Sequence, residues 1–209
     1  MKHKKTMLLS TLLCLLPILL GLVLWPQLPE QVPIHFDFAG NPDNYAPKAA
    51  AIVGLPLFMA AVNFICHWAM SRDKKATEAS PAVMLAITGW ICPLLCNILM
   101  PVTLFMGMGI EVPITLVASL IVGLTFVIIG NYLPKVKPNR YMGIKLPWTF
   151  ASEENWRRTH RFGGFVWVLA GICAILAAIF NQEWLLLVSL FAALLLPTVY
   201  SWRLSRKNI

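Results

Sequence analysis

The chain has 209 residues, of which 58% are hydrophobic and only 12% are charged, and its formal net charge is +8. A soluble domain is usually about 45–50% apolar and about 25% charged, so this composition excludes a water-soluble globular protein. It also excludes intrinsic disorder, which requires low hydrophobicity and many charges. The sequence therefore predicts an integral membrane protein.

Six apolar stretches are long enough to cross a membrane as helices, since a hydrocarbon core about 30 Å thick needs roughly 20 residues. They cover residues 7–25, 49–70, 83–106, 114–133, 165–180 and 184–202. The first is expected to be a retained span, because it is long for a signal peptide and no small-residue cleavage site follows Trp25 and Pro26. The predicted fold is an all-α polytopic membrane protein, with residues 1–209 forming one six-span domain.

The basic residues predict how these spans are oriented. With six spans, all 17 Lys and Arg residues except Lys48 fall on one side of the membrane. By the positive-inside rule this side is cytoplasmic, and both termini lie there. The net positive charge then indicates contact with anionic lipids, and no nucleic-acid partner is expected.

Residues 26–48 form the first long loop and are predicted to be a small ordered extracellular cap. Apolar residues recur at 32, 34, 36 and 38, the period of a half-buried strand, and residues 40–44 are typical of a turn. This period places His35 and Asp37 on one face, with Asp43 near them. Three such side chains could bind a divalent metal ion. The simpler interpretation is that His35 and Asp37 hydrogen-bond to backbone groups and hold the cap together.

Residues 131–164 form the second long loop, which is predicted to be cytoplasmic and to contain a surface helix. Ser152 is a suitable N-cap, and two glutamates follow it where a helix dipole favours anions. Trp156 and His160 share one face of this helix, and Gly163-Gly164 is expected to break or bend it before the fifth span. The helix could bind a soluble partner or an anionic headgroup, or it could simply rest on lipid phosphates.

Small residues also follow one face of the fifth span, at Ala170, Ala174 and Ala178. This spacing allows the backbone of another helix to approach closely. The neighbouring helix could belong to the same chain or to a second copy, so a homo-oligomer formed through the fifth span is one interpretation.

The two loops carry a family resemblance. In the first loop, a recurrent element of a bacterial membrane domain of unknown function is matched by Pro29, Pro33, His35, Phe36, Gly40, Pro42, Asp43 and Lys48. The second loop resembles the signature of the SdpI family through Asn139, Gly143, Ile144, Lys145, Trp148, Thr149, Trp156, His160, Arg161 and Gly163. Lys145 stands where arginine is commoner, which keeps the charge but loses a bidentate fork. Together with six spans, the two motifs cover nearly the whole chain.

The resemblance implies a location in the bacterial plasma membrane and a role in immunity. The namesake of the family protects Bacillus cells from their own secreted toxic peptide, and it also draws a small cytoplasmic repressor to the membrane once toxin is bound. By this resemblance, an extracellular toxic peptide and a cytoplasmic repressor are the expected partners. Binding of the peptide would have to favour one of two helix arrangements for the signal to pass.

Two groups of residues are therefore candidate sites. The ligand-binding or cap-organising group in the first loop comprises His35, Phe36, Asp37, Gly40, Pro42, Asp43, Tyr45 and Lys48. The partner-docking group in the second loop comprises Asn139, Gly143, Lys145, Trp148, Thr149, Trp156, Arg157, His160 and Arg161. No cofactor and no catalytic residue is expected. The alternative functions are a small membrane transporter, and a metal-dependent membrane enzyme with a site at His35, Asp37 and Asp43.

Overall fold

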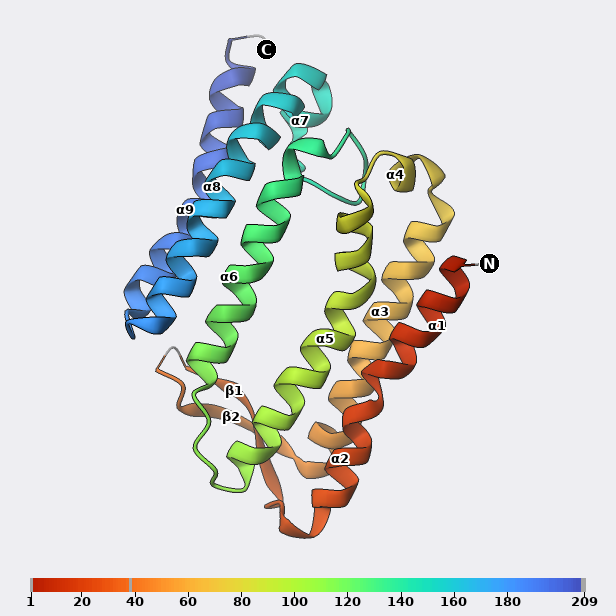
Figure 1. Cartoon of the computed structure of the whole chain (residues 1–209), viewed down its shortest axis with the longest axis vertical. Helices are drawn as coiled ribbons and strands as arrows, with labels where there is room; N and C mark the ends of the chain where they lie inside the picture. Colours follow the sequence, from red (N-terminus) through yellow and green to blue (C-terminus); the bar gives the residue numbers. More distant parts are fainter. Residues whose placement is uncertain (1, 38, 208–209) are drawn as a thin grey trace. The chain divides into compact units, whose positions relative to one another are not determined.

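The computed structural model describes residues 2–37 and 39–207, so Phe38, the last residue of the alternating pattern, lies outside the described residues. Six of the described helical stretches are long and apolar enough to cross a membrane, which confirms the predicted spans. The chain divides into two compact units (Figure 1). One contains residues 1–72 and 85–114, the other contains residues 73–84 and 115–209, and each is described by itself.

The first unit combines three spans with a small sheet. Its elements are α1 (Lys2–Cys14), α2 (Leu16–Leu24), the short helix η1 (Trp25–Gln27), β1 (Gln31–Phe36), β2 (Pro42–Pro47), the π-turn η2 (Ala50–Gly54), α3 (Leu55–Arg72) and nearly all of α5 (Ala82–Gly107). The first span was predicted as one uninterrupted helix, but Leu15 separates α1 from α2. The cause is Pro17, which has no N–H to donate to the carbonyl of Leu13.

Side chains from neighbouring helices satisfy the carbonyls that such prolines leave without a donor. The Leu13 carbonyl, released by Pro17, accepts a hydrogen bond from Asn97 Nδ2 at 2.8 Å. The Gly89 carbonyl, four residues before Pro93, lies 3.2 Å from His67 Nε2. Unsatisfied backbone groups are costly inside a membrane, so these bonds explain why polar residues occur within apolar spans. Asn97 and His67 therefore have a structural role that does not require a transport path.

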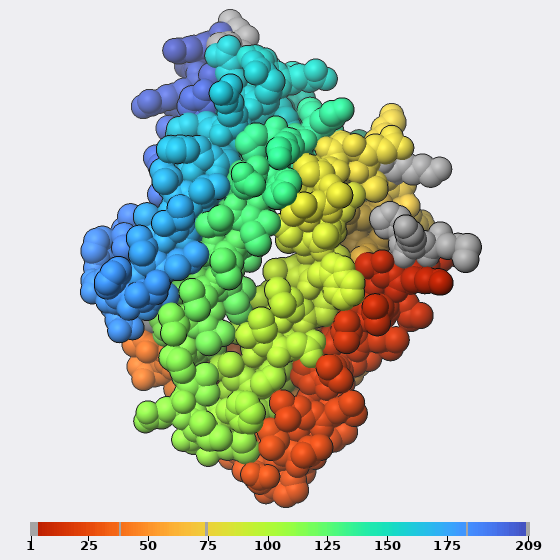
Figure 2. Space-filling view, viewed as in Figure 1, coloured from red at the N-terminus to blue at the C-terminus, as the bar shows by residue number. Residues whose placement is uncertain are grey.

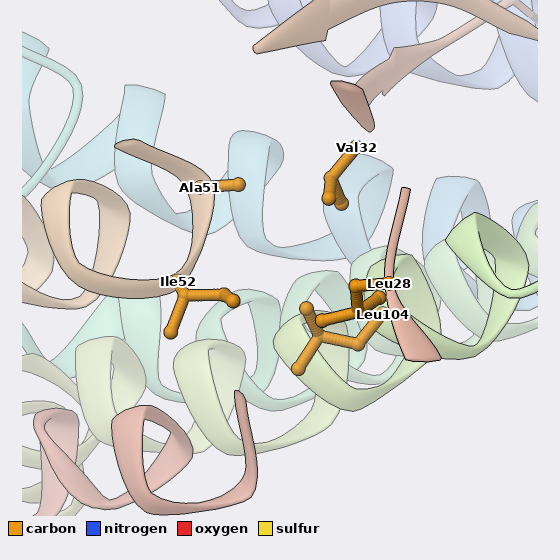
Figure 3. Packing of buried hydrophobic residues seen from close by; sticks show 5 residues of the cluster. All are labelled: Leu28, Val32, Ala51, Ile52 and Leu104. Carbon is orange, nitrogen blue, oxygen red and sulfur yellow. The ribbon is translucent and has the colours of Figure 1, made fainter. Parts of the chain in front are cut away.

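The hairpin formed by β1 and β2 is anchored to the helices by an apolar cluster. Val32 of β1 is fully buried and lies beside Leu28, Ala51, Ile52 and Leu104 (Figure 3). Figure 3 shows these side chains lying close together, Val32 from β1, Ala51 and Ile52 from η2, Leu104 from α5, and Leu28 from the segment before β1. The predicted strand is confirmed, because β1 buries Val32 and Pro33 while His35 stays exposed. Its partner β2 was predicted only as a turn.

The second unit contains the other three spans and the second long loop. Its elements are α4 (Lys74–Glu78), α6 (Ile114–Tyr132), the short helix η3 (Leu133–Lys135), α7 (Pro147–Ala151), α8 (Glu153–Ile179) and α9 (Glu183–Ser205). Pro197 lies inside α9 and has no N–H to donate to the Ala193 carbonyl, which accepts a hydrogen bond from Trp167 Nε1 of α8 at 2.9 Å instead. As in the first unit, a side chain of a neighbouring helix donates to the carbonyl that a proline leaves without a donor.

The predicted break at Gly163 and Gly164 was wrong, since α8 runs through both glycines without interruption. A helix of 27 residues is about 40 Å long, which exceeds the roughly 30 Å hydrocarbon core. The expected surface helix is therefore the N-terminal part of the fifth span. The glycines serve close packing: a Cβ at Gly163 would lie 2.5 Å from Ile144 Cδ1, and one at Gly164 would lie 2.6 Å from the Gly130 carbonyl oxygen.

Helices α6 and α8 approach so closely that their glycines face each other's backbone. A Cβ on Gly123 would lie 2.7 Å from the Gly171 carbonyl oxygen, and a Cβ on Gly171 would lie 2.5 Å from the Gly123 carbonyl oxygen. Gly130 and Gly164 form a second such pair, seven residues away on each helix. In the space-filling view, atoms of α6 (green) and α8 (cyan to blue) touch (Figure 2).

The alanine stripe of the fifth span is not available to a second copy of the chain. Ala170, Ala174 and Ala178 are 5%, 0% and 7% exposed, because they are packed within this chain. The helix that approaches this face therefore belongs to the same chain, and a homo-oligomer formed through the fifth span stays a prediction.

Candidate functional site

The first loop presents most of its candidate residues on the outside of the hairpin. His35 Nδ1 lies 2.5 Å from Asp43 Oδ1, which links β1 to β2, and both side chains are well exposed. Tyr45 is 51% exposed on β2, where Pro42 is also exposed, while Phe36 is half-buried. The structure thus brings His35, Asp43 and Tyr45 together on one small, accessible element.

Asp37 has a different role from His35. Its Oδ1 accepts the Asn41 N–H at 2.8 Å and its Oδ2 accepts Asn41 Nδ2 at 3.2 Å, while Gly40 completes the turn with a φ of 88°. These bonds from Asn41 lower the pKa of the Asp37 carboxyl below its ordinary value. Within residues 2–37 and 39–207, no three His, Cys, Asp or Glu side chains are grouped to hold a metal ion, so the proposed His35, Asp37 and Asp43 metal set is not assembled.

Lys48 joins the end of β2 to the start of the hairpin. Its backbone N–H donates to the Glu30 carbonyl at 2.9 Å, and its ammonium lies 2.8 Å from Glu30 Oε1. The same ammonium lies 5.1 Å from the centroid of the Trp25 ring, which is within cation–π range. Since only 15% of the Lys48 side chain is exposed, it stabilises the base of the hairpin more than it forms an accessible site.

In the second loop, two aromatic side chains of α8 hold residues 136–146, which we call the strap. Trp156 is 2% exposed, and its Nε1–H donates to the Val136 carbonyl at 2.8 Å. The His160 ring stacks on the Trp156 ring at a centroid separation of 4.1 Å. Both residues thus face the interior of the unit, where they fix the strap to the helix.

His160 holds the strap through a hydrogen bond that requires a neutral ring. The Ile144 N–H donates to His160 Nε2 at 2.9 Å, so this nitrogen carries no proton. The other ring nitrogen lies 2.8 Å from the Trp156 carbonyl, so Nδ1–H is the donor there. Gly143 lets the strap come this close, because its φ is 111° and a Cβ there would collide with His160 Nε2.

Two further residues of the docking group, Asn139 and Thr149, form hydrogen bonds with backbone groups in and beside the strap. Asn139 Oδ1 accepts the backbone N–H groups of Tyr141 and Met142 at 2.9 Å and 2.8 Å. Thr149 is 1% exposed, and its hydroxyl accepts the Leu146 N–H at 2.9 Å, which starts α7. Trp148 is half-buried, and its indole nitrogen finds no acceptor within the part of the chain that the structure describes.

Only the basic members of the docking group face outward. Arg157 and Arg161 are exposed on α8, and Lys145 is exposed on the strap, where its ammonium lies 3.3 Å from the Arg140 carbonyl. Glu154 pairs with Arg157 at 2.7 Å and with Arg158 at 2.5 Å. The outward-facing members of the docking group are therefore these cations and not the buried aromatic residues.

Sequence reasoning missed a buried polar group that connects α8 to α9. Asn155 Nδ2 donates to the Ser201 carbonyl at 3.1 Å, and the hydroxyls of Ser201 and Thr159 donate to Asn155 Oδ1 at 2.6 Å and 3.0 Å. All three residues are 0% exposed. The available signal was the Asn-x-x-x-Thr spacing, which puts Asn155 and Thr159 on one face of the helix.

Comparison with known proteins matches both loops. Residues 135–201 match the SdpI/YfhL protein family, and residues 12–60 match a domain of unknown function, DUF1648. Over 210 aligned residues the chain is 29% identical to the "Immunity protein SdpI" of Bacillus subtilis (strain 168), covering 97% of each chain. A 41-residue stretch is 46% identical to the uncharacterized membrane protein YbgB of the same organism, covering 20% of this chain and 45% of that protein. No solved structure matches the chain.

These matches coincide with the loops described above. The hairpin lies within the DUF1648 range, and the strap with the helix that holds it lies within the SdpI range. Together with six membrane-crossing helices, they indicate a multi-pass protein of the bacterial plasma membrane. The resemblance found in the sequence is thereby confirmed: residues 135–201 match the model of the SdpI/YfhL protein family, and residues 12–60 before them match that of the DUF1648 domain.

Proposed function

We propose that this chain is an immunity protein that protects the cell producing it from a toxic extracellular peptide. The observation that carries this proposal is the similarity to Immunity protein SdpI over 97% of both chains, which includes both ordered loops. A similarity limited to one loop would support a shared module only. The proposal is tested by expressing the chain in a Bacillus subtilis strain that lacks SdpI and measuring survival against the secreted peptide.

We propose further that both termini and the strap are cytoplasmic and that the hairpin is extracellular. The support is the charge distribution, since Lys48 is the one basic residue on the hairpin side of the six spans. In this orientation the hairpin meets a peptide arriving from outside, and the strap meets cytoplasmic partners and anionic headgroups. Labelling of a single cysteine placed at Gln31 by a membrane-impermeant thiol reagent, in a variant whose five native cysteines are replaced, tests this orientation.

The side-chain contact between His35 and Asp43 leads to a prediction about protection against the peptide. Replacing His35 or Asp43 by alanine removes the side-chain contact between β1 and β2, and we expect protection to be lost while the protein remains in the membrane. The reason is that an exposed contact between two side chains adds little to stability, while we expect it to fix the shape of the surface that the peptide meets. Survival is measured beside the membrane level of each variant. Gln31→Ala, an exposed change on β1, is the matched control, and full protection by His35→Ala and Asp43→Ala would contradict the prediction.

A relay to a cytoplasmic repressor is a second part of the proposal, carried by the exposed arginines of α8. Arg157→Ala should reduce recruitment of a fluorescent repressor to the membrane several-fold and leave protection intact, because Arg157 is exposed and Glu154 keeps its pair with Arg158. Arg203→Ala, an exposed change on α9, is the control. If recruitment and protection fell together, this end of α8 would have a structural role only, and unchanged recruitment would exclude Arg157 from the docking surface.

A further inference from the structure

Strand β2 is an exposed edge of a two-stranded sheet. Every residue of β2 is exposed except Ala46, which is half-buried, whereas β1 buries Val32 and Pro33. In the described residues the sheet contains β1 and β2 alone, so β2 has a side that faces away from its partner. An edge of this kind is a template on which another strand can form.

The hydrogen-bond pattern shows which backbone groups this edge offers. Lys48 N–H donates to the Glu30 carbonyl, so these two residues form a hydrogen-bonded pair of the antiparallel ladder. Such pairs alternate with pairs whose backbone groups point outward. Counting along the register, Val32 and Ala46 are bonded to each other, and the N–H and carbonyl of Tyr45, opposite Pro33, point away from β1.

The outward N–H of Tyr45 is occupied only by a local side chain. It donates to Asn44 Oδ1 at 2.8 Å, and Asn44 is exposed, so a rotation of this side chain frees the donor. Pro42 and Pro47 have no N–H and limit the open edge to residues 43–46. The edge is therefore short, and it favours a short extended segment over a long strand.

The charges around the edge define the partner. Glu30, Asp37 and Asp43 are exposed, and Lys48, the one Lys or Arg residue of the hairpin, pairs with Glu30, so two of the three carboxylates have no Lys or Arg partner in the hairpin. The surface that surrounds β2 is thus acidic. A partner that supplies both an extended backbone and positive charge is complementary to it.

We propose that an extended cationic peptide segment adds to β2 as a third strand, through the outward N–H and carbonyl of Tyr45. This inference rests on the proposed function, because it states how the toxic peptide would be held and what charge it would carry. The backbone bonds would supply attachment, and the acidic side chains would select the charge of the segment.

The test measures binding to the full chain in nanodiscs of zwitterionic phosphatidylcholine, with empty discs as the background. The probe is a nine-residue peptide of alternating lysine and valine. A second probe has its four central residues N-methylated, which removes their backbone donors, and a third replaces lysine by glutamate. The variants are Tyr45→Pro, which removes the outward N–H, and Tyr45→Ala, which removes the ring and keeps the N–H.

We expect Tyr45→Pro and N-methylation each to raise the Kd at least tenfold, Tyr45→Ala to raise it less than threefold, and the glutamate peptide to bind at least tenfold more weakly. Equal binding of the methylated peptide would overturn the proposal even if Tyr45→Pro damaged the hairpin, because that comparison uses the unchanged protein. Equal losses in Tyr45→Ala and Tyr45→Pro would assign binding to the ring instead of the edge. If the edge instead binds a second copy of the chain, Tyr45→Pro should lower the mass of the assembly and leave peptide binding unchanged. That result would also overturn the proposal.

This binding test uses no toxin, so it separates the two proposals. A chain that binds the lysine peptide through β2 but gives no protection would contradict the immunity function and leave the edge assignment intact. A chain that protects cells but binds the methylated peptide equally well would keep the function and lose the edge assignment.

Discussion

Replacing Gly143 by alanine is expected to release the strap from α8 and to lower the free energy of unfolding by about 2–4 kcal/mol. The backbone at Gly143 has a φ of 111°, which strains any residue with a Cβ. The new methyl group would also collide with His160 Nε2 and lie 2.9 Å from Trp156 Cζ2. Neither ring can move easily, because both are buried and hydrogen-bonded.

The measurement is unfolding of the detergent-solubilised chain, combined with amide hydrogen exchange at Ile144, whose N–H donates to His160. Gly109→Ala is the matched control, since Gly109 also has a positive φ, of 81°, but has open space where the Cβ would be. The variant should exchange the Ile144 amide at least tenfold faster than the control does. Unchanged protection of this amide in Gly143→Ala would contradict the role assigned to the glycine.

Replacing Gly171 by alanine is expected to separate α6 from α8 and to destabilise the chain by about 1–3 kcal/mol. The added Cβ would lie 2.5 Å from the Gly123 carbonyl oxygen and 2.8 Å from the Val127 backbone nitrogen. Both contacts are with the backbone of α6, so a side-chain rotation cannot relieve them and the helices must move apart. Close van der Waals contact is a main source of helix association in membranes, and this contact would be lost.

A double substitution sharpens this test. Both substitutions disrupt the same contact between the helices. Once Gly171→Ala has separated the helices, adding Gly123→Ala should therefore lower the free energy of unfolding much less than Gly123→Ala does alone. Gly54→Ala is the control, since Gly54 also lies in a helical segment but has no atom within 4 Å of its Cβ position. Unfolding in detergent measures all four variants. Strictly additive costs would show that Gly123 and Gly171 do not form one contact.

Hydropathy and charge were sufficient to predict the six spans, because a membrane imposes one length and one composition on every helix that crosses it. The alternating pattern likewise predicted β1, since Val32 is buried and His35 exposed. Strand β2 was missed because its sequence consists mainly of residues that also favour turns, such as Pro42, Asp43 and Asn44. What makes it a strand is pairing with β1, which no local pattern reports.

The second loop shows a different limit of sequence reasoning. Gly163 and Gly164 were read as helix breakers because glycine costs a helix about 1 kcal/mol per residue, yet the packing of Ile144, Gly130 and Pro134 against them outweighs that cost. Trp156 and His160 were correctly placed on one face, but their sequence does not show whether that face meets a partner or the strap. The glycine pairs of α6 and α8 share a spacing of seven residues, which brings both glycines of each helix to one face.

The most direct test of the immunity function is a killing curve. A Bacillus subtilis strain without SdpI would express either this chain or an empty vector and be exposed to increasing amounts of the toxic peptide secreted by its SdpI-bearing relatives. Membrane insertion would be confirmed in the same cells. If the chain is an immunity protein, the peptide dose that kills half of the cells should rise at least tenfold over the vector control. A killing curve that coincides with the control, although the chain is fully inserted, would contradict the function proposed here.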